Sequence, residues 1–562
     1  GSTNLTFNEN SKDLQATLKM LDEAEKNNVA VSFLLSPHYF FDDIAMVNGF
    51  SYSQPGCFFY YNINHPMARE IVENFLRTLI PLIKDYKCIN NFCISNEPNF
   101  DTSLLPEFYS GEWHEWLSEK YNGDISQLNS AYNSEYTSFD QVELKYDVFD
   151  RSILGQTYDY MQFNNKVLGE WHKFMADIVH ELAPDIPVNA KILGWVNSSE
   201  YRQGYMRGTG LEEYYKFLDI NGCDYNHFLD SVNQGILTKE MWYDYMLSFK
   251  NAPVVDTEDH LIRDNSSNFY PDELADYVGN AIYMGAIHGR AMSDIWVWER
   301  SMHNTALRDS ILYRPDAIAK VGYAANDLNR LSYEITALQN EPAEVGIIFS
   351  NNDQIFNSWQ SAHALYEAYE ALNFNGKKTR FILDVDPSAM QNYKAVIVPC
   401  TRYISDAMLE ELNKFVNNGG KVLIMGRGDS ISGTGCLSMN EYGAVRDASS
   451  YRNIYDNAYF AKYSGVIQME SMTKQEFCSI VRNMLTDAGI YHIKLVNADT
   501  NEPAHNVEYN IGTYDNKLII NLSNFGDTQN IKIYSGDTLL NDSLNLISGE
   551  TEGGIITLDK FE

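Results

Sequence analysis

The stretch Cys93-Ile-Ser-Asn-Glu-Pro-Asn99 decides the fold that this chain is expected to adopt. Its apolar first half is typical of a short buried strand, and Pro98 ends that strand because proline has no amide hydrogen to donate. Glu97 therefore stands at the carboxyl end of the strand, with the Asn96 amide beside it as a hydrogen-bond donor. Active sites of parallel α/β barrels lie at this end of the strands. We predict that Glu97 is a catalytic carboxyl group.

On both sides of Glu97, short apolar strands alternate with amphipathic helices, the pattern of a parallel α/β sheet or barrel. The six predicted strands span residues 29–35, 91–95, 187–193, 222–225, 252–257 and 294–298. A closed (β/α)8 TIM barrel needs about eight strands. Because the chain opens in a predicted helix at 12–26 and begins with Gly1-Ser2, which is typical of an expression vector, we expect the missing N-terminal units to lie outside this chain.

Two further patterns follow the barrel region. A flavodoxin-like α/β sheet is predicted from strands at 345–349, 380–383, 395–398 and 421–425, with helices near 359–373, 405–417 and 473–488. Short alternating strands at 517–521, 531–534 and 554–557 predict a small β-sandwich. We therefore expect three domains, at 1–335, 336–492 and 493–562. Because the middle one lacks a GxGxxG or P-loop motif, it is interpreted as an oligomerisation or rim element.

The composition excludes several classes of partner. Lys and Arg total 42 against 76 Asp and Glu, so the formal net charge of −34 has the wrong sign for nucleic acid or an anionic membrane. No stretch approaches the roughly 20 apolar residues of a membrane span. Aromatic residues make up 13% of the chain and suit sugar faces and hydroxyls. The seven cysteines have no CxxC spacing, so we expect free buried thiols, no metal site and no cofactor.

A second acidic strand supplies a partner for Glu97. Glycoside hydrolysis needs one carboxylic acid to protonate the leaving oxygen and a second carboxylate on the other side of the bond. Val254-Val-Asp-Thr-Glu-Asp-His260 is an apolar strand that ends in acidic residues. Asp256, Asp259 and Glu299 compete with Glu258 for the nucleophile's role. Alternation places Asp256 and Glu258 on one face, and only Glu258 lies at the predicted strand end, so we predict Glu258 as the nucleophile.

Other residues near predicted strand ends are candidates for sugar contacts, each with ordinary packing as the alternative. They are His38 and Tyr39 after the first strand, Asn189, Lys191 and Trp195 around the third, Asp224, Tyr225 and His227 around the fourth, and Trp298 and Glu299 on the last. Tyr225 is a candidate for holding the nucleophile's carboxylate, with a structural role as the alternative. Trp298 is expected to form a flat platform beneath the sugar ring.

Together these motifs resemble clan A of the glycoside hydrolases, and within it the family 42 β-galactosidases. The Asn96-Glu97-Pro98 motif and the later Glu258 carry the clan resemblance. The family resemblance lies in Trp113-His-Glu-Trp-Leu117, Lys120-Tyr-Asn-Gly-Asp124, Leu128-Asn-Ser-Ala-Tyr132, Tyr158-Asp-Tyr-Met-Gln-Phe163 and the stretch from His288-Gly-Arg290 to Trp296-Val-Trp-Glu-Arg300. It covers nearly the whole chain. It implies that Glu97 is the acid/base at the fourth barrel strand and Glu258 the nucleophile at the seventh.

The resemblance also implies a function and marks two departures. It implies a retaining exo-β-glycosidase, with β-galactosidase activity on oligosaccharides as the first expectation, a homotrimer built through the middle domain, and a cytoplasmic location, with periplasmic or secreted as alternatives. The family's four-cysteine zinc cluster is not matched, and Ser36-Pro-His-Tyr-Phe40 differs from the family loop at the substrate site. A β-mannosidase or another clan A β-glycosidase is therefore the nearest alternative. A carbohydrate-binding protein without catalysis is the second.

Overall fold

The computed structural model describes most of the chain. The described residues are 8, 10–36, 42–52, 59–194, 199–226, 237–262, 274–299, 310–356, 358–399, 401, 403–425, 452–453, 474–541, 550–552 and 555–562. The chain forms two compact units. The first comprises Gly1–Gly194, Arg202–Asp224 and Phe249–Thr257, and the second comprises Trp195–Tyr201, Tyr225–Ser248 and Glu258–Glu562. The predicted catalytic strands fall in both units, so each is described within its own.

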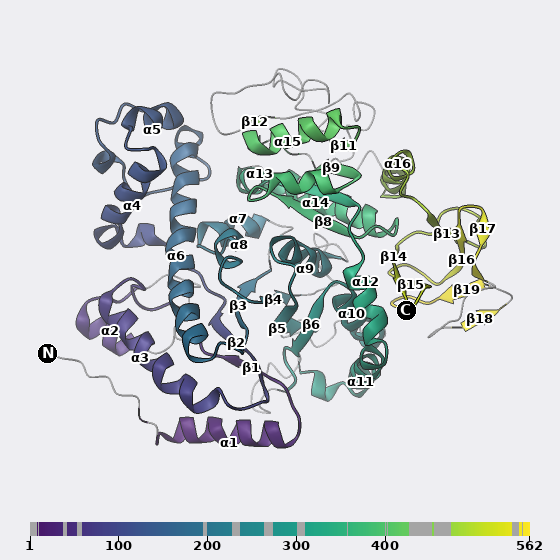
Figure 1. Cartoon of the computed structure of the whole chain (residues 1–562), viewed down its shortest axis with the longest axis horizontal. Helices are drawn as coiled ribbons and strands as arrows, with labels where there is room; N and C mark the ends of the chain where they lie inside the picture. Colours follow the sequence, from purple (N-terminus) through teal and green to yellow (C-terminus); the bar gives the residue numbers. More distant parts are fainter. Residues whose placement is uncertain are drawn as a thin grey trace. The chain divides into compact units, whose positions relative to one another are not determined.

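All six predicted barrel strands form one sheet, in the order of the chain (Figure 1). They are β1 (Val31–Leu34), β2 (Ile89–Asn96), β3 (Val188–Leu193), β4 (Asn221–Asn226), β5 (Val254–His260) and β6 (Arg290–Ile295). The first four pair in parallel, as a βα repeat requires. The predicted parallel α/β sheet is thus confirmed. The last strand begins four residues before its predicted start at 294. The prediction missed this start because the first residues of the strand include polar ones, which an apolar pattern does not detect.

Helices connect these strands. Within the first unit they are α1 (Lys12–Lys26), α2 (Asp42–Asn48), α3 (Pro66–Ile83), α4 (Pro106–Lys120), α5 (Ile125–Tyr132), α6 (Leu154–Leu182) and α8 (Leu211–Tyr214). The predicted helix at 12–26 has the predicted bounds, and Ser11 caps it by accepting a hydrogen bond from the Leu14 amide. Helix α6 is 29 residues long and buries much of its length, which makes it the main support of β2 and β3.

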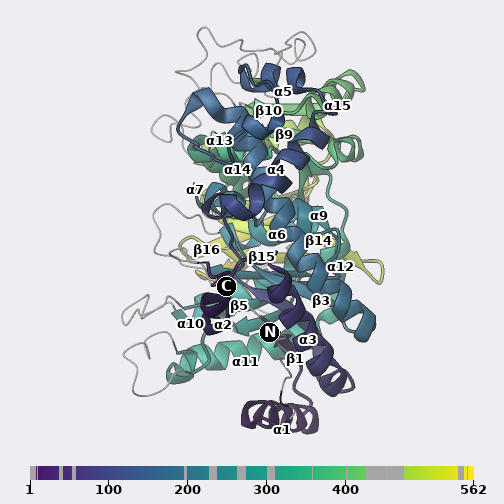
Figure 2. The same ribbon diagram turned by 90° about the vertical axis from the view of Figure 1, so that its left-hand side faces the viewer.

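In the second unit, α9 (Thr238–Phe249) and α10 (Leu274–Ile287) follow β4 and β5, and α11 (Pro315–Arg330) and α12 (Ser332–Asn340) follow β6. Helix α7 (Ser199–Met206) lies between β3 and β4 in the chain. Figures 1 and 2 both show α10 against α11, and the apolar residues between them, including Val278, Ala281 and Ala317, form one buried core.

The predicted middle region contains a second parallel sheet, in the order β11-β9-β7-β8. Its strands are β7 (Val345–Phe349), β8 (Thr379–Leu383), β9 (Ala395–Pro399) and β11 (Lys421–Met425). The helices are α13 (Asn351–Phe356), α14 (Ser358–Asn373), α15 (Asp406–Asn417) and α16 (Lys474–Asp487). The first strand in sequence lies between the second and the third, which is the strand order of a doubly wound sheet.

The C-terminal region consists of antiparallel sheets. One joins β13 (Ile493–Asn497), β16 (Gln529–Ser535), β19 (Ile555–Leu558) and β18 (Glu550–Glu552), with β17 (Thr538–Leu539) on β16. The other pairs β14 (Val507–Tyr514) with β15 (Lys517–Asn524). Apolar side chains from both, such as Leu495, Tyr509 and Ile533, share one buried core. The predicted alternating strands therefore form antiparallel sheets whose apolar side chains share one core.

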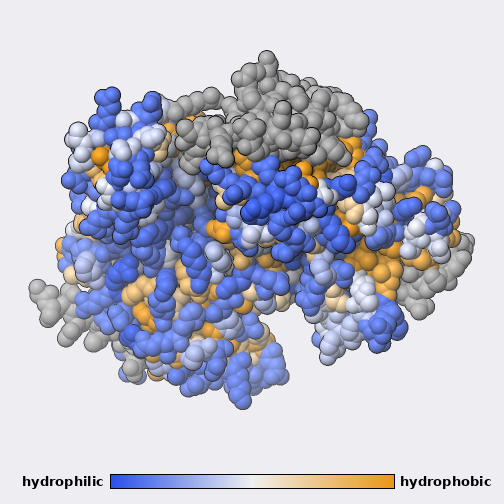
Figure 3. Space-filling view, turned by 45° about the horizontal axis from the view of Figure 1, so that its top comes forward, coloured by the Kyte–Doolittle hydropathy of each residue, from blue (hydrophilic) through white to orange (hydrophobic). Residues whose placement is uncertain are grey.

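The surface and the cysteines agree with the composition. The described side chains on the face shown in Figure 3 are mostly hydrophilic, with hydrophobic ones in scattered groups. Among the described residues, no helix has both the length and the apolar character needed to cross a membrane. Cys88, Cys93 and Cys223 are buried and form no disulfide, as predicted, and Cys478 forms none and is partly buried.

Candidate active site

Glu97 directly follows β2 in a backbone conformation that ends the strand. Its φ angle is +42°, in the left-handed region that residues other than glycine rarely adopt. Its amide donates a hydrogen bond of 3.0 Å to the carbonyl oxygen of Lys191 on β3, which fixes this conformation to the neighbouring strand. Asn96 before it and Pro98 after it are buried, whereas Glu97 is partly exposed. A strained residue held in place by its surroundings is typical of functional sites, and here it bears the predicted carboxyl group.

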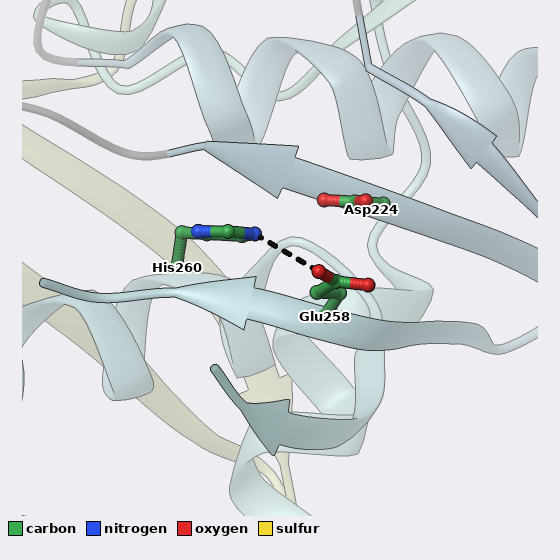
Figure 4. Close-up of side chains that lie close together, drawn as sticks. All are labelled: Asp224, Glu258 and His260. Carbon is green, nitrogen blue, oxygen red and sulfur yellow. Dashed lines mark ion pairs between the residues drawn. The ribbon is translucent and has the colours of Figure 1, made fainter. Parts of the chain in front are cut away.

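Glu258 lies within β5 rather than past its end, because the strand continues to His260. Side chains alternate along a strand, so Glu258 and His260 share one face. Nε2 of His260 lies 3.6 Å from Oε1 of Glu258, and both side chains are at most 10% exposed (Figure 4). The imidazole is thus placed to balance the negative charge of a buried carboxylate when it carries a proton. No role was predicted for His260 from its place in the sequence.

The neighbouring carboxylate, Asp259, is excluded as a nucleophile by its contacts. It points to the opposite face of β5, and its oxygens bind Lys239 of α9, Arg290 of β6 and the Ser293 hydroxyl. Burial alone would raise the pKa of Asp259, but the two cations outweigh burial and lower it to about 2. A carboxylate with both oxygens engaged in this way has no free oxygen with which to attack a sugar.

The other two competitors lie in different settings. Asp256 is fully buried on the Glu258 face, two residues deeper in the strand. Glu299 is exposed beyond the end of β6, where Tyr313 donates a hydrogen bond of 3.3 Å to its Oε1. The burial pattern therefore leaves Glu258 as the acidic residue nearest the mouth of β5 on its inner face.

The sugar-contact candidates have different surroundings. Trp298 lies three residues beyond β6 and is 48% exposed. Tyr225 is buried on β4. Asn189 donates a hydrogen bond of 2.6 Å to Asn91, which also accepts one from Ser32, so Asn189 belongs to a polar ladder across β1, β2 and β3. His38, Tyr39, Trp195 and His227 lie outside the described residues.

Figure 4 draws three side chains of types that bind divalent cations: Asp224 from β4, with Glu258 and His260 from β5. A bound cation would occupy the Glu258 carboxylate and draw away the electron pair that it needs for attack. A metal at these residues and a nucleophilic Glu258 are therefore competing interpretations. The two-carboxylate chemistry requires no metal.

Sequence reasoning gave no role to Lys239, Arg290 or Ser293, although they surround the residue next to the predicted nucleophile. Lys239 stands in the first turn of α9, whose residues from Thr238 to Leu247 are all buried. A lysine and a glutamate in an otherwise buried helix were the available signal. Their partners come from β5 and β6, which the local sequence of α9 does not indicate.

Comparison with known proteins gives a consistent family. A family model described as β-galactosidase of glycoside hydrolase family 42 matches residues 48–216. The β-galactosidase Pbg of Clostridium perfringens is 21% identical over 411 residues, which cover 64% of this chain and 54% of that protein. The β-galactosidase BbgII of Bifidobacterium bifidum is 22% identical over 401 residues, covering 66% and 55%. The chain thus spans about half the length of the curated relatives that it matches.

Solved structures share the fold over almost the entire chain. A family 42 exo-carrageenase of Bacteroides ovatus superposes with a TM-score of 0.73 at 18% identity, covering 100% of this chain and 77% of that one. A catalytic mutant of a family 42 β-galactosidase of G. stearothermophilus gives a TM-score of 0.72 at 16% identity, covering 98% and 90%. At these identities the likeness establishes the fold, with its parallel sheets and C-terminal antiparallel sheets.

Proposed function

From the premise that this chain is a clan A glycoside hydrolase of the family 42 kind, we propose that it is a retaining exo-β-glycosidase in which Glu258 is the nucleophile and Glu97 the general acid/base. Glu258 attacks the anomeric carbon while Glu97 protonates the departing oxygen. Glu97 then removes a proton from water, which releases the sugar from Glu258 with its original configuration. We propose that the six-stranded sheet is part of a (β/α)8 barrel.

The observation that carries this proposal is the buried Glu258 on the inner face of β5, with His260 at 3.6 Å. A nucleophilic carboxylate must stay ionised and must attack the sugar without a tightly held shell of water. A buried carboxylate beside a basic group meets both requirements. Glu97 follows β2 of the same parallel sheet and is partly exposed, which suits a group that exchanges protons with leaving group and water. A retaining mechanism requires the two carboxyl groups to lie about 5–5.5 Å apart in the substrate complex.

We propose a β-galactoside as the substrate, as the names of the curated relatives indicate. The exo-carrageenase among the structural relatives suggests a second candidate, a sulfated galactan oligosaccharide. The net charge of −34 disfavours that candidate, because a polyanionic protein repels a polyanionic chain at low ionic strength. A β-mannoside remains an alternative, because the sequence at 36–40 differs from the family's loop at the substrate site. A carbohydrate-binding protein without catalysis is the last alternative.

A panel of nitrophenyl glycosides tests the proposal directly. We expect the wild-type protein to cleave the β-galactoside faster than the β-mannoside, the β-glucoside and the α-L-arabinopyranoside. Glu258→Gln should lower kcat at least 10⁴-fold, roughly the loss expected when a covalent nucleophile is removed. Circular dichroism should show that this variant is folded. Full activity of Glu258→Gln would reject the assignment, and silence of the wild type on every sugar would favour a binding protein.

The remaining features follow as parts of the same proposal. We propose three domains at 1–335, 336–492 and 493–562, with a flavodoxin-like middle domain, a β-sandwich at the end and assembly into a trimer through the middle domain. The expected cellular location is the cytoplasm, where imported oligosaccharides are cleaved. Light scattering of the purified protein at several concentrations would test the trimer, with a mass other than three times 64.3 kDa contradicting it.

A further inference from the structure

A cluster of charged side chains holds β5 from its outer face, opposite to Glu258. Asp259 binds Lys239 of α9, and the side chains of both are 0% exposed. Nη1 of Arg290 lies 2.6 Å from the Asp259 Oδ2, and the Ser293 hydroxyl donates to the same oxygen at 2.6 Å. We refer to Lys239, Asp259, Arg290 and Ser293 as the β5 anchor.

The anchor connects four elements, α9, β5, β6 and α10, through Asp259 and Arg290. Nη2 of Arg290 donates a hydrogen bond of 3.0 Å to the carbonyl oxygen of Ile282 on α10. The carbonyl oxygen of Asp259 accepts from the Trp296 amide at 2.9 Å, which ties β5 to the segment that follows β6. Asp259 shares a peptide bond with Glu258. The place of the Glu258 backbone is therefore set by contacts with α9, β6 and, through Arg290, α10.

Stability alone is a poor reason for such a cluster. Removing two ions from water costs several kcal/mol each, and apolar residues of similar volume often replace a buried ionic set without loss of stability. The position of the cluster gives another reason. A nucleophile must lie about 3–3.5 Å from the carbon that it attacks, and a misplacement of about 1 Å can lower the rate roughly 100-fold.

We propose that the β5 anchor is a positioning device that fixes the carboxyl-terminal end of β5, so that Glu258 is aimed at the anomeric carbon of a bound β-glycoside. The inference rests on the proposed function, in which Glu258 is the nucleophile. Asp259, Lys239 and Arg290 make and break no bond. They act through the placement of the neighbouring carboxylate.

The decisive variant replaces the ionic core of the anchor by apolar residues: Lys239→Met, Asp259→Leu and Arg290→Met together. If the anchor served only stability, the folded variant would keep the wild-type kcat. We expect instead that kcat falls about 10- to 100-fold while KM changes less than about threefold, since substrate binding is retained and the attack is not. The rate of covalent inactivation by 2,4-dinitrophenyl 2-deoxy-2-fluoro-β-D-galactopyranoside, which reports the first step alone, should fall by the same factor.

A milder pair keeps the test decisive if the triple variant does not fold. Arg290→Lys keeps a cation beside Asp259 but loses the planar guanidinium that also reaches Ile282, so its kcat should fall less than that of Arg290→Met, which removes the ion pair and should lower kcat at least tenfold. The matched control is Glu508→Gln, which neutralises another side chain that is 0% exposed and paired with a buried cation, on β14. It should lower the melting temperature and leave kcat unchanged.

The outcomes separate the two proposals. Wild-type kcat in the folded triple variant, or equal kcat in Arg290→Lys and Arg290→Met, would overturn the positioning role while leaving the glycosidase in place. If Glu258→Gln kept the activity of the wild-type protein, the proposed function would be overturned, and the positioning role with it. A fall in kcat of the Glu508→Gln control as large as that of Arg290→Met would show that any buried charge acts alike, which contradicts a specific anchor.

Discussion

Nε2 of His288 lies 2.7 Å from Oε1 of Glu508, although 220 residues separate them in the chain. The other ring nitrogen, Nδ1, lies 2.8 Å from the Asp244 carboxylate on α9. Arg380 of β8 and the Tyr369 hydroxyl of α14 also bind Asp244. The imidazole therefore joins three regions of the sequence through largely buried charged side chains. These regions are the barrel region, the middle sheet and the C-terminal sheets.

This buried network predicts a loss of stability at alkaline pH. Burial by itself lowers the pKa of His288, but Asp244 and Glu508 outweigh it and raise the pKa from 6.5 to about 10. The proton is held more tightly in the folded state, so its contribution is complete below pH 6.5 and is lost as the pH rises through 10. Burial raises the pKa of Glu240 from 4.5 to about 7, which acts in the same direction. Urea unfolding at pH 6, 8 and 10 should give a steadily falling free energy, and a flat profile would contradict this assignment.

His288→Gln should remove most of that dependence and destabilise the protein. The variant leaves the Glu508 carboxylate buried without its cation, which typically costs about 3–5 kcal/mol. The loss should be largest near pH 6, where the wild-type histidine is charged, and should shrink towards pH 10. Urea unfolding of both proteins across this range measures the difference. An equal loss at every pH would indicate a packing defect.

Replacement of Glu97 should affect substrates according to their leaving group. Glu97→Ala removes the acid, so hydrolysis of a nitrophenyl β-galactoside, whose leaving group needs little protonation, should fall less than hydrolysis of lactose. Added azide should accelerate the variant and yield a β-galactosyl azide, because the nucleophile Glu258 is intact. An α-configured azide product, or no azide effect, would assign a different role to Glu97.

Metal removal should leave activity unchanged. Attack by Glu258 requires a free carboxylate, so a cation at Asp224, Glu258 and His260 would inhibit the reaction. We expect dialysis against EDTA to alter kcat by less than about twofold, and added Zn²⁺ to inhibit in a manner that EDTA reverses. Loss of activity in EDTA with recovery on adding metal would support the metal interpretation of these three residues.

Gly376 offers a test of the packing between the middle sheet and the C-terminal sheets. Its φ angle is +66°, and a Cβ atom there would lie 2.0 Å from the ring of Tyr509 on β14. Gly376→Ala should therefore destabilise the protein by more than the roughly 1 kcal/mol of the left-handed conformation alone. Thermal unfolding measures the loss. Gly419→Ala serves as the control, because its φ is +89° and its Cβ would meet no atom within 4 Å.

The sequence by itself determined most of the elements, and it singled out two carboxyl groups, those of Glu97 and Glu258, whose catalytic roles stay predictions. Alternating apolar strands and amphipathic helices are local patterns, so the strands of both parallel sheets and the helix at Lys12–Lys26 were predicted within a few residues. The position of Glu97 was equally local, since Pro98 marks the strand end. The prediction of Glu258 as the nucleophile rested on strand alternation and on its place at the predicted strand end, and in the structure Glu258 and its neighbour Asp259 are both buried but have different partners, His260 and Lys239.

Only the tertiary structure decided what the buried charges do. Lys239, Asp259 and Arg290 come from three separate elements, and nothing in the sequence near one of them indicates the other two. The same holds for His288, whose partners lie in α9 and β14. The polar start of β6 escaped the apolar pattern for this reason, because its Arg290 and Ser293 are satisfied by Asp259 on β5. Whether a buried polar residue is stable depends on partners that the fold brings from distant segments, and local sequence carries no record of them.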